Sequence, residues 1–211
     1  MSQDYPAPLL FFRSLLSDPL KMGALAPSSS RLSRLMASRV DPAQSSVLEI
    51  GAGTGAITRA LLHTGLCPER LFVIERDPEL AAFLRARFPY VKVHCGEAIH
   101  AARILSVESV ERVETIVSSL PLRNLPQCDQ LELVRAMMSA LSHRGQIIQF
   151  TYAAGCPIPY RRLGLDAERL GRVWMNFPPA TVWRFTKSIL SPRETRRTPN
   201  LYATADCVCP D

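Results

Sequence analysis

Residues 47–58 read VLEIGAGTGAIT, and this stretch decides the fold of the chain of 211 residues. An apolar run comes first, three glycines at alternate positions follow, and a helix-forming segment runs from Ala56 to His63, before Gly65. This order predicts a buried strand, a tight turn and a helix, because glycine adopts backbone angles that a β-carbon forbids. The glycines also let a ligand lie against the main chain at the helix N-terminus.

The acid before the glycines separates two interpretations of this turn. Gly51, Gly53 and Ala56 also satisfy the G-x-G-x-x-A pattern of dinucleotide-binding proteins. Glu49, however, would repel a pyrophosphate and attract a cationic ligand. The arrangement E-x-G-x-G-x-G resembles the first motif of class I S-adenosylmethionine (SAM) methyltransferases, whose cofactor carries an ammonium and a sulfonium. We therefore favour SAM over NAD and place Glu49, Gly51, Gly53 and Gly55 at the cofactor site.

A second apolar run, residues 71–75, predicts another buried parallel strand that ends in an acid. At this position the carboxylate of Glu75 can accept hydrogen bonds from both ribose hydroxyls of an adenosine ligand. Enzymes that bind NAD use the same device, so Glu75 supports adenosine and does not decide the chemistry. Asp77 is expected to cap a helix over residues 78–87.

Two later strands carry further motifs at their ends. Residues 91–95 predict a third strand, and Gly96-Glu97-Ala98 after it resembles the G-D-A motif of methyltransferases, whose acid meets the adenine amino group. A fourth strand over 114–118 leads into S-S-L-P-L, which stands where ribosomal RNA adenine dimethylases have N-L-P-Y. Ser119 takes the asparagine position and Leu122 the aromatic position. Since the aromatic ring stacks a flipped adenine, Leu122 disfavours base methylation.

The pattern of the remaining sequence completes an α/β fold. We expect a helix over 129–141, a turn at 143–145, a strand over 145–151, a loop over 153–160, and a hairpin of 172–177 with 180–185 joined by two prolines. The fold class is thus a class I methyltransferase Rossmann-like sheet, mostly parallel, with helices on both faces and a C-terminal antiparallel hairpin. Trp174 and Trp183 either fill the core or offer aromatic faces to a methylated ammonium.

The N-terminal region predicts amphipathic helices. Leu9, Phe12, Leu15, Leu16 and Leu20 share one side of residues 8–23, and Phe11 widens it. This helix covers the core, lies in a membrane interface, or exchanges between the two positions. Serines 28–30 are expected to cap a helix over 31–38. We divide the chain into N-terminal helices that cover the cofactor (1–40), a methyltransferase domain (41–190) and a poorly ordered polar tail (191–211).

Composition limits the location and the partners. No apolar run approaches the roughly 18 residues that span a bilayer, and the N-terminus lacks the basic start of a secretion signal, which indicates a cytosolic protein. The net charge is +6, and all but three of the 25 basic residues are arginine. This surface points to a phosphate-bearing partner, either nucleic acid or anionic membrane. Six cysteines without zinc-finger or redox spacing indicate reduced thiols and no metal site.

From about residue 10 to residue 185, the chain resembles the bacterial phosphatidylethanolamine N-methyltransferases of the soluble, dimethylase-like type. The shared pieces are F-x-R-S-x-x-x-x-P-x-K-x-G-A-x-A-P-S-S, L-E-I-G-A-G-T-G, S-S-L-P-L, Q-F-T-Y and R-V-W-x-N-F-P-P-A. The resemblance implies SAM as cofactor, a phospholipid substrate, and a cytoplasmic enzyme that is peripheral on the anionic inner membrane. It implies no nucleic acid and no obligate protein partner.

The resemblance also implies roles for individual residues. Catalytic positions are Ser118, Ser119 and Tyr152. Cofactor contacts come from Met22, Gly23, Glu49, Gly51, Gly53, Gly55, Glu75, Arg76, Glu97, Ala98 and Ser118. Contacts with substrate or membrane come from Phe11, Phe12, Arg13, Lys21, Trp174 and Trp183. The alternatives are an RNA adenine N-methyltransferase and a non-catalytic SAM-binding or NAD-dependent protein.

Overall fold

Strands and helices alternate along the chain in the computed structural model, which describes residues 26–43, 46–153, 155–174 and 178–188. The strands are β1 (Val47–Ile50), β2 (Leu71–Glu75), β3 (Lys92–Cys95), β4 (Val113–Ser118), β5 (Leu141–Thr151), β6 (Leu165–Val173) and β7 (Ala180–Lys187). The helices are α2 (Ala26–Ala37), α3 (Ala56–His63), α4 (Pro78–Arg87), α5 (Ala101–Val107) and α6 (Gln127–Ala140). Short 3-10 turns lie at η1 (Pro68–Arg70), η2 (Ala98–His100), η3 (Leu122–Asn124) and η4 (Tyr160–Leu163).

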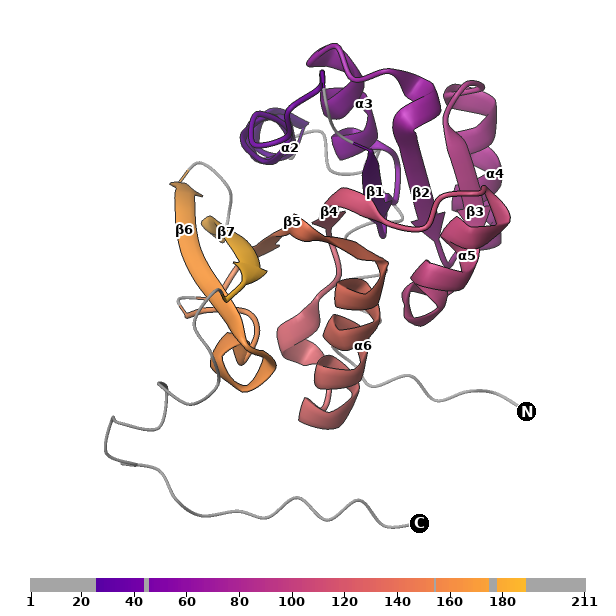
Figure 1. Cartoon of the computed structure of the whole chain (residues 1–211). Coiled ribbons are helices and arrows are strands. Elements are labelled where there is room, and N and C mark those ends of the chain that lie inside the picture. The colour runs from indigo at the N-terminus through magenta and orange to yellow at the C-terminus, as the bar shows by residue number, and fades with distance from the viewer. Residues whose placement is uncertain (1–25, 44–45, 154, 175–177, 189–211) are drawn as a thin grey trace, which may run out of the picture.

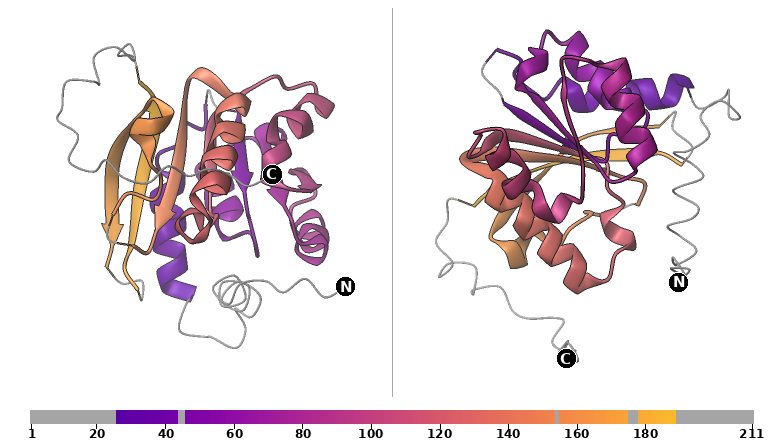
Figure 2. Two further views of the ribbon diagram at one scale, coloured as in Figure 1. Left: turned by 90° about the horizontal axis from the view of Figure 1, so that it is seen from below. Right: turned by 90° about the vertical axis from the view of Figure 1, so that its right-hand side faces the viewer.

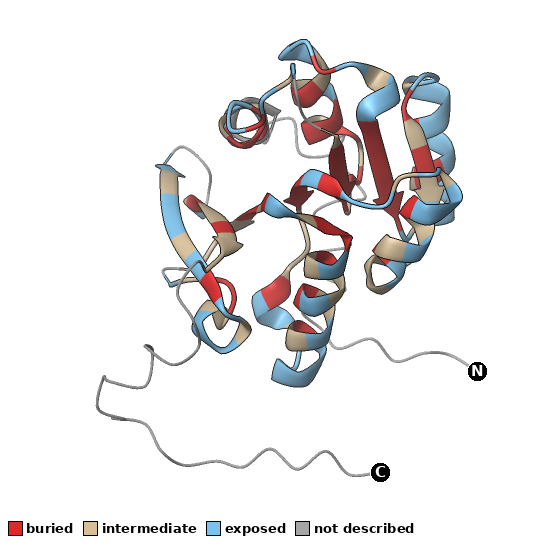
Figure 3. Ribbon diagram, viewed as in Figure 1, coloured by how far each residue is buried: buried red, intermediate tan, exposed pale blue. Residues whose placement is uncertain are grey.

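The strands of the described chain form one sheet in the order β3-β2-β1-β4-β5-β7-β6. Strands β1 to β5 pair in parallel, and β7 pairs antiparallel with both β5 and β6. Helices α2, α3 and α4 pack on one face of the sheet, and α5 and α6 pack on the other (Figure 1). The central strands are buried between these layers, as Figure 3 shows. The predicted class I methyltransferase fold is confirmed.

The first half of the sheet follows the sequence closely. Strand β2 and helices α3 and α4 have the bounds that the apolar runs predicted, and every residue of β1 and β2 is buried. Asp77 caps α4, because its carboxylate accepts hydrogen bonds from the amides of Glu79 (2.9 Å) and Leu80 (3.2 Å). These elements were predictable because helix caps, glycines and buried runs act over a few neighbouring residues.

The turn predicted at residues 143–145 is wrong, because these residues belong to β5. The register between β4 and β5 shifts between Val113 and Thr115, so β5 carries an irregularity at this place. A β-carbon on Gly145 would lie 2.6 Å from Leu141 Cγ and 2.9 Å from the carbonyl oxygen of Glu114. The glycine therefore permits a close approach of two strands, and it does not end the strand.

Two further boundaries differ from the sequence prediction. Helix α2 starts at Ala26, so serines 28–30 lie inside the helix and do not cap one that starts at residue 31. Strand β6 spans Leu165–Val173, seven residues earlier than predicted at its start, because it pairs with β7 over most of that strand's length. None of the described helices is long and apolar enough to cross a bilayer.

The turn after β1 predicts a sharp difference between two glycine substitutions. Gly55 has φ +79°, and a β-carbon there would lie 2.6 Å from Phe88 Cε2 and 2.9 Å from Leu84 Cδ2. We expect Gly55→Ala to lower the free energy of unfolding by about 2–4 kcal/mol, through left-handed strain and overpacking. Gly65 has φ +91°, and a β-carbon there would meet no atom within 4 Å, so Gly65→Ala should cost only about 1–2 kcal/mol. Urea denaturation measures both, and equal losses would contradict the packing argument.

Candidate cofactor and substrate site

The predicted site residues meet at the carboxyl edge of the parallel strands. Strand β1 lies between β2 and β4, where the strand order reverses, and such a reversal forms a ligand crevice in doubly wound sheets. The glycine turn follows β1, Arg76 follows β2, Glu97 follows β3, Ser119 follows β4 and Tyr152 follows β5. The fold thus brings together positions that lie far apart in the chain, because parallel strands need long crossover connections.

Glu75 joins two of the turns at this edge. Its Oε2 accepts a hydrogen bond from the amide of Gly53 (2.8 Å), and its Oε1 accepts one from the amide of Asp77 (3.0 Å). The carboxylate is buried, at 7% exposure. Besides its predicted contact with ribose, Glu75 therefore fixes the glycine turn after β1 relative to the start of α4. This second role was not visible in the sequence.

The glycine turn has the backbone that its residues permit. Gly51, Gly53 and Gly55 all have positive φ, at +73°, +57° and +79°. A β-carbon on Gly51 would lie 3.1 Å from Leu120 Cδ2, which belongs to the segment that follows β4. The turn after β1 and the segment after β4 therefore touch, and a larger residue at Gly51 would push them apart.

Glu49 is completely buried, which the sequence interpretation did not foresee. Thr58 Oγ1 donates a hydrogen bond to its Oε2 (2.7 Å), whereas Oε1 has no hydrogen-bond partner among the described residues. Burial raises the pKa of Glu49 to about 7, and the hydrogen bond from Thr58 opposes this shift. A cation near the unpaired oxygen would favour the ionised form, so the site fits a positively charged ligand.

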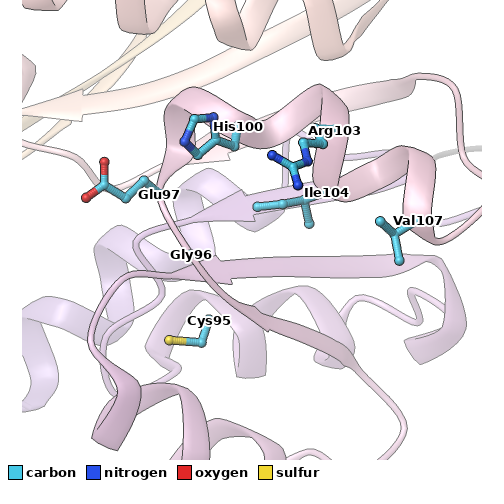
Figure 4. Close-up of a pocket in the computed structure, with 7 residues that line it drawn as sticks. All are labelled: Cys95, Gly96, Glu97, His100, Arg103, Ile104 and Val107. Carbon is cyan, nitrogen blue, oxygen red and sulfur yellow. The ribbon is translucent and has the colours of Figure 1, made fainter.

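Arg76 and Glu97 lie at the outer end of the site and pair with each other, with Nε and Oε1 3.5 Å apart. Both side chains are more than half exposed, so solvent screens this pair. Glu97 also borders a cavity of about 240 Å³ between the end of β3 and α5. In Figure 4 the carboxylate of Glu97 points away from Ile104 and Val107, two apolar residues that also line the cavity. The predicted adenine contact of Glu97 and Ala98 would thus form beside this cavity and not deep inside it.

The segment after β4 is held by a residue that sequence reasoning did not assign a role. Gln149 Nε2 donates hydrogen bonds to the carbonyl oxygens of Leu120 (2.9 Å) and Phe150 (2.8 Å). Ser118 is fully buried, and its Oγ accepts a hydrogen bond from the amide of Leu120 (3.3 Å). The amide of Ser119 donates to the carbonyl oxygen of Ile50 (3.0 Å). Strand β5 therefore sets the position of the predicted catalytic serines. Gln149 is the first residue of the Q-F-T-Y motif, but the motif alone does not reveal that this side chain bonds to the segment after β4.

Leu122 does not face the site. It is 2% exposed in η3, where its carbonyl oxygen accepts a hydrogen bond from Gln130 Nε2 (3.0 Å). The side chain packs in the core beneath α6. The position that we compared with the aromatic residue of RNA adenine dimethylases is therefore filled by a core leucine.

The aromatic candidates have different surroundings. The Tyr152 ring is half-buried and packs edge-on against Phe150, with ring centroids 5.3 Å apart. Trp183 stacks on Phe185, and its buried Nε1 has no hydrogen-bond partner among the described residues. Trp174 is 69% exposed, so the interpretation of both tryptophans as core is wrong for Trp174.

The remaining predicted contacts lie outside the described residues, as does the tail. They are Met22, Gly23, Phe11, Phe12, Arg13 and Lys21.

Comparison with known proteins identifies a relative that covers most of the chain. The ornithine lipid N-methyltransferase of Singulisphaera acidiphila is 33% identical over 176 residues, which span 81% of this chain and 91% of that protein. The ribosomal RNA small subunit methyltransferase A of Maridesulfovibrio salexigens is 41% identical over only 54 residues, which span 26% of this chain and 20% of that protein. No family model matches the sequence.

Solved structures resemble the fold. The N-methyltransferase NodS of Bradyrhizobium japonicum, in complex with S-adenosyl-L-homocysteine, has a TM-score of 0.57 at 20% identity and covers 81% of this chain and 92% of its own. The 1,6-didemethyltoxoflavin-N1-methyltransferase of Burkholderia thailandensis has a TM-score of 0.57 at 16% identity, over 89% of this chain and 93% of its own. At sequence identities this low, the similarity to these two proteins shows a shared fold and nothing about substrate.

The contacts of Glu75 predict a loss of cofactor affinity on substitution. Glu75→Ala removes the acceptor for the Gly53 amide and the predicted ribose contact, so we expect the affinity for S-adenosylhomocysteine to fall by about 1.5–3 kcal/mol. Calorimetry measures this loss, and Glu79→Ala, an exposed acid on the next helix, is the matched control. An unchanged affinity of Glu75→Ala, or tighter binding of NAD than of SAM by the unaltered protein, would overturn the assignment.

The buried carboxyl of Glu49 predicts a pH dependence of stability. In the folded protein the carboxyl group of Glu49 stays protonated up to about pH 7, whereas in the unfolded chain it loses the proton near its ordinary pKa of 4.5. Between pH 4.5 and about 7 the folded state therefore binds more protons than the unfolded chain. As a result, the free energy of unfolding should fall by about 3 kcal/mol as the pH rises from about 5 to 7. Glu49→Gln should remove this slope. Denaturation at several pH values compares the two proteins, and parallel curves would show that Glu49 does not titrate in this range.

Proposed function

The chain belongs to the family of lipid-type, SAM-dependent N-methyltransferases with the class I fold, and from this premise we propose that it methylates the amine of phosphatidylethanolamine and of its mono- and dimethyl derivatives. The observation that carries the proposal is the relationship to a lipid N-methyltransferase over nearly that protein's whole length. The shorter likeness to RNA methyltransferases involves a fraction of their chains.

The site fits the cofactor of this family. SAM supplies an electrophilic methyl group on a positively charged sulfur. Glu49 holds an unpaired, buried oxygen beside the glycine turn, where a positive charge would be stabilised. Glu75 keeps one edge of that turn in place, and Leu120 keeps the other. The protein thus offers a preformed cradle with a buried carboxyl that can ionise beside a positive charge, and the turn itself contains no cationic side chain of the kind that binds phosphate.

The substrate amine needs placement and the loss of a proton. A lone pair on nitrogen has to be free before a methyl group is accepted, so each ammonium must give up its proton first. In this proposal the segment after β4 positions the amine, because Gln149 and Ser118 hold its backbone in a single arrangement. Tyr152 lies at the end of the adjacent strand and supplies an aromatic face for the increasingly cationic products. Water accepts the released proton.

An ornithine lipid is a second candidate substrate, because the relative that covers most of the chain carries that name. Both lipids present a primary amine at the surface of a bilayer, so the same site chemistry serves either one. The predicted N-terminal helix, with Phe11 and Phe12 on its apolar side, would place the enzyme at that surface on the cytoplasmic side. RNA methylation is disfavoured, since Leu122 offers no ring for base stacking, a contact of roughly 1–3 kcal/mol.

Expression in a bacterial host that contains phosphatidylethanolamine and lacks phosphatidylcholine tests the proposal. We expect mono-, di- or trimethylated phosphatidylethanolamine in lipid extracts separated by chromatography, and much less of these products with the Glu75→Ala variant. Purified protein is then incubated with labelled SAM and one of three acceptors: vesicles with phosphatidylethanolamine, vesicles with ornithine lipid, or ribosomal RNA.

The three acceptors separate the possible outcomes. Transfer to phosphatidylethanolamine supports the proposal, and transfer to ornithine lipid alone would replace the substrate and keep the family. Labelled RNA without labelled lipid would overturn the proposal.

A further inference from the structure

The sheet face that carries α5 and α6 changes from apolar to polar on the way to the edge that holds the site. Strands β7 and β6 extend the sheet beyond β5, as Figures 1 and 2 show. Across these three strands, Ile147 pairs with Phe185 and Phe185 pairs with Ala167, and all three side chains pack in the core on that face. Alternate residues of a strand share a face, so the next row towards the site lies on this face too. It consists of Gln149, Trp183 and Arg169.

A second polar row follows at the end of these strands. It consists of Thr151, Thr181 and Arg172. The register of β6 shifts between Arg169 and Gly171, and this irregularity brings Arg172 back to the face of Arg169. Gly171 faces the other way, since a β-carbon there would lie 3.2 Å from Leu35 Cδ2 of α2. The two arginines therefore project from the face opposite to α2.

Two buried polar atoms in the first of these rows have no hydrogen-bond partner among the described residues. They are Gln149 Oε1 and Trp183 Nε1, an acceptor and a donor on neighbouring strands. Gln149 is 1% exposed, and its Nε2 is already bonded to the segment after β4. Buried polar groups without partners are rare, because each one costs free energy. A polar ligand beside this row would satisfy them.

The two arginines of these rows are available to an anion. Arg169 and Arg172 are exposed, and their guanidinium groups form no ion pair or hydrogen bond with any described residue. The acids of β6 alternate onto the opposite face, where Glu168 pairs with Arg184. The Arg172 guanidinium lies 4.2 Å from the ring centroid of Trp174, a contact that restricts its orientation. Unpaired guanidinium groups suit a phosphate or a carboxylate, which they can bind through two parallel hydrogen bonds.

The spacing of the strands suits a headgroup whose acid lies close to its amine. Neighbouring strands lie about 4.8 Å apart, so β6 lies about 10 Å from β5. Gln149 of β5 holds the segment that positions the amine in the proposed function, and arginine side chains of β6 can extend over β7 towards it. A short chain joins the amine to a phosphate in phosphatidylethanolamine and to a carboxylate in ornithine lipid. An acid above β7 and an amine above β5 match this arrangement.

We propose that Arg169 and Arg172 form a subsite for the acidic group of the acceptor lipid and thereby place the neighbouring amine at the segment after β4. Trp183 Nε1 adds a donor in the same row. The inference rests on the proposed function in so far as the acceptor is a lipid with an amine. The subsite sets specificity, because it distinguishes an amine that carries a nearby acid from a neutral amine of similar shape.

Initial rates of methyl transfer to short-chain lipids test the proposal. Dihexanoyl phosphatidylethanolamine is used as a monomer, so that affinity for a bilayer plays no part. The second acceptor is the aminoethyl ether of dihexanoylglycerol, which keeps the amine and the acyl chains and lacks the phosphate. Arg169→Gln and Arg172→Gln should each raise KM for the phospholipid about tenfold and change kcat less than about twofold. Neither variant should change KM for the ether.

Two further variants control for charge and for folding. Arg162→Gln removes an exposed arginine before the other end of β6, so it should leave KM for both acceptors unchanged. Arg172→Lys keeps the charge and loses the planar fork, so its KM should lie between those of the unaltered protein and Arg172→Gln. Thermal unfolding confirms that each variant folds.

Calorimetry measures the same contact without turnover. Dihexanoyl phosphatidylethanolamine is titrated into the full chain saturated with S-adenosylhomocysteine. The double variant Arg169→Gln/Arg172→Gln should bind this lipid about 100-fold more weakly than the unaltered protein.

The outcomes separate this inference from the proposed function. An unchanged KM for the phospholipid in both single variants would overturn the subsite, even where phosphatidylethanolamine is methylated. Equal rises of KM for the phospholipid and for the ether would also overturn it, because they indicate a general distortion of the site. Methylation of a short-chain ornithine lipid alone, with a KM that depends on the two arginines, would support the subsite and refute the proposed substrate. A protein that neither methylates nor binds these lipids refutes both.

Discussion

The carboxylate of Glu75 connects the two turns on which the site depends. One oxygen accepts the Gly53 amide of the turn after β1, and the other accepts the Asp77 amide at the start of α4. Three glycines with positive φ allow the first turn to form, but they contribute no side chains that could fix its conformation. The buried carboxylate of Glu75 fixes the turn by accepting a hydrogen bond from its backbone. Hydrogen bonds to an ionised group are about twice as strong as neutral ones. The residue that we predict to contact the ribose thus also shapes the cradle.

Glu49 illustrates how burial prepares a site for a cation. The carboxyl lies under the glycine turn with one oxygen bonded to Thr58 and the other without a partner among the described residues. Desolvation raises its pKa to about 7, so the group can be neutral without ligand and become ionised beside a positive charge. An unpaired buried oxygen lowers the stability of the empty protein. The ligand that pairs with it recovers that free energy on binding.

The antiparallel extension of the sheet returns the chain to the edge that holds the candidate site. Strand β5 ends at the site, and β7 and β6 reverse twice so that Trp174 and Arg172 reach the same edge.

The sequence by itself determined the elements whose signals are local. Strand β2 and helices α3 and α4 have the predicted bounds, because a buried run, an Asp77 cap and a glycine each act within a few residues. It also placed the candidate site at the strand ends, since alternating strands and helices predict a parallel sheet and hence a common edge. Tertiary structure alone decided the rest. The irregular pairing of β5 and the early start of β6 depend on a partner strand, and the burial of Glu49 and Leu122 depends on packing across layers. These contacts join residues far apart in the chain, so no short pattern encodes them.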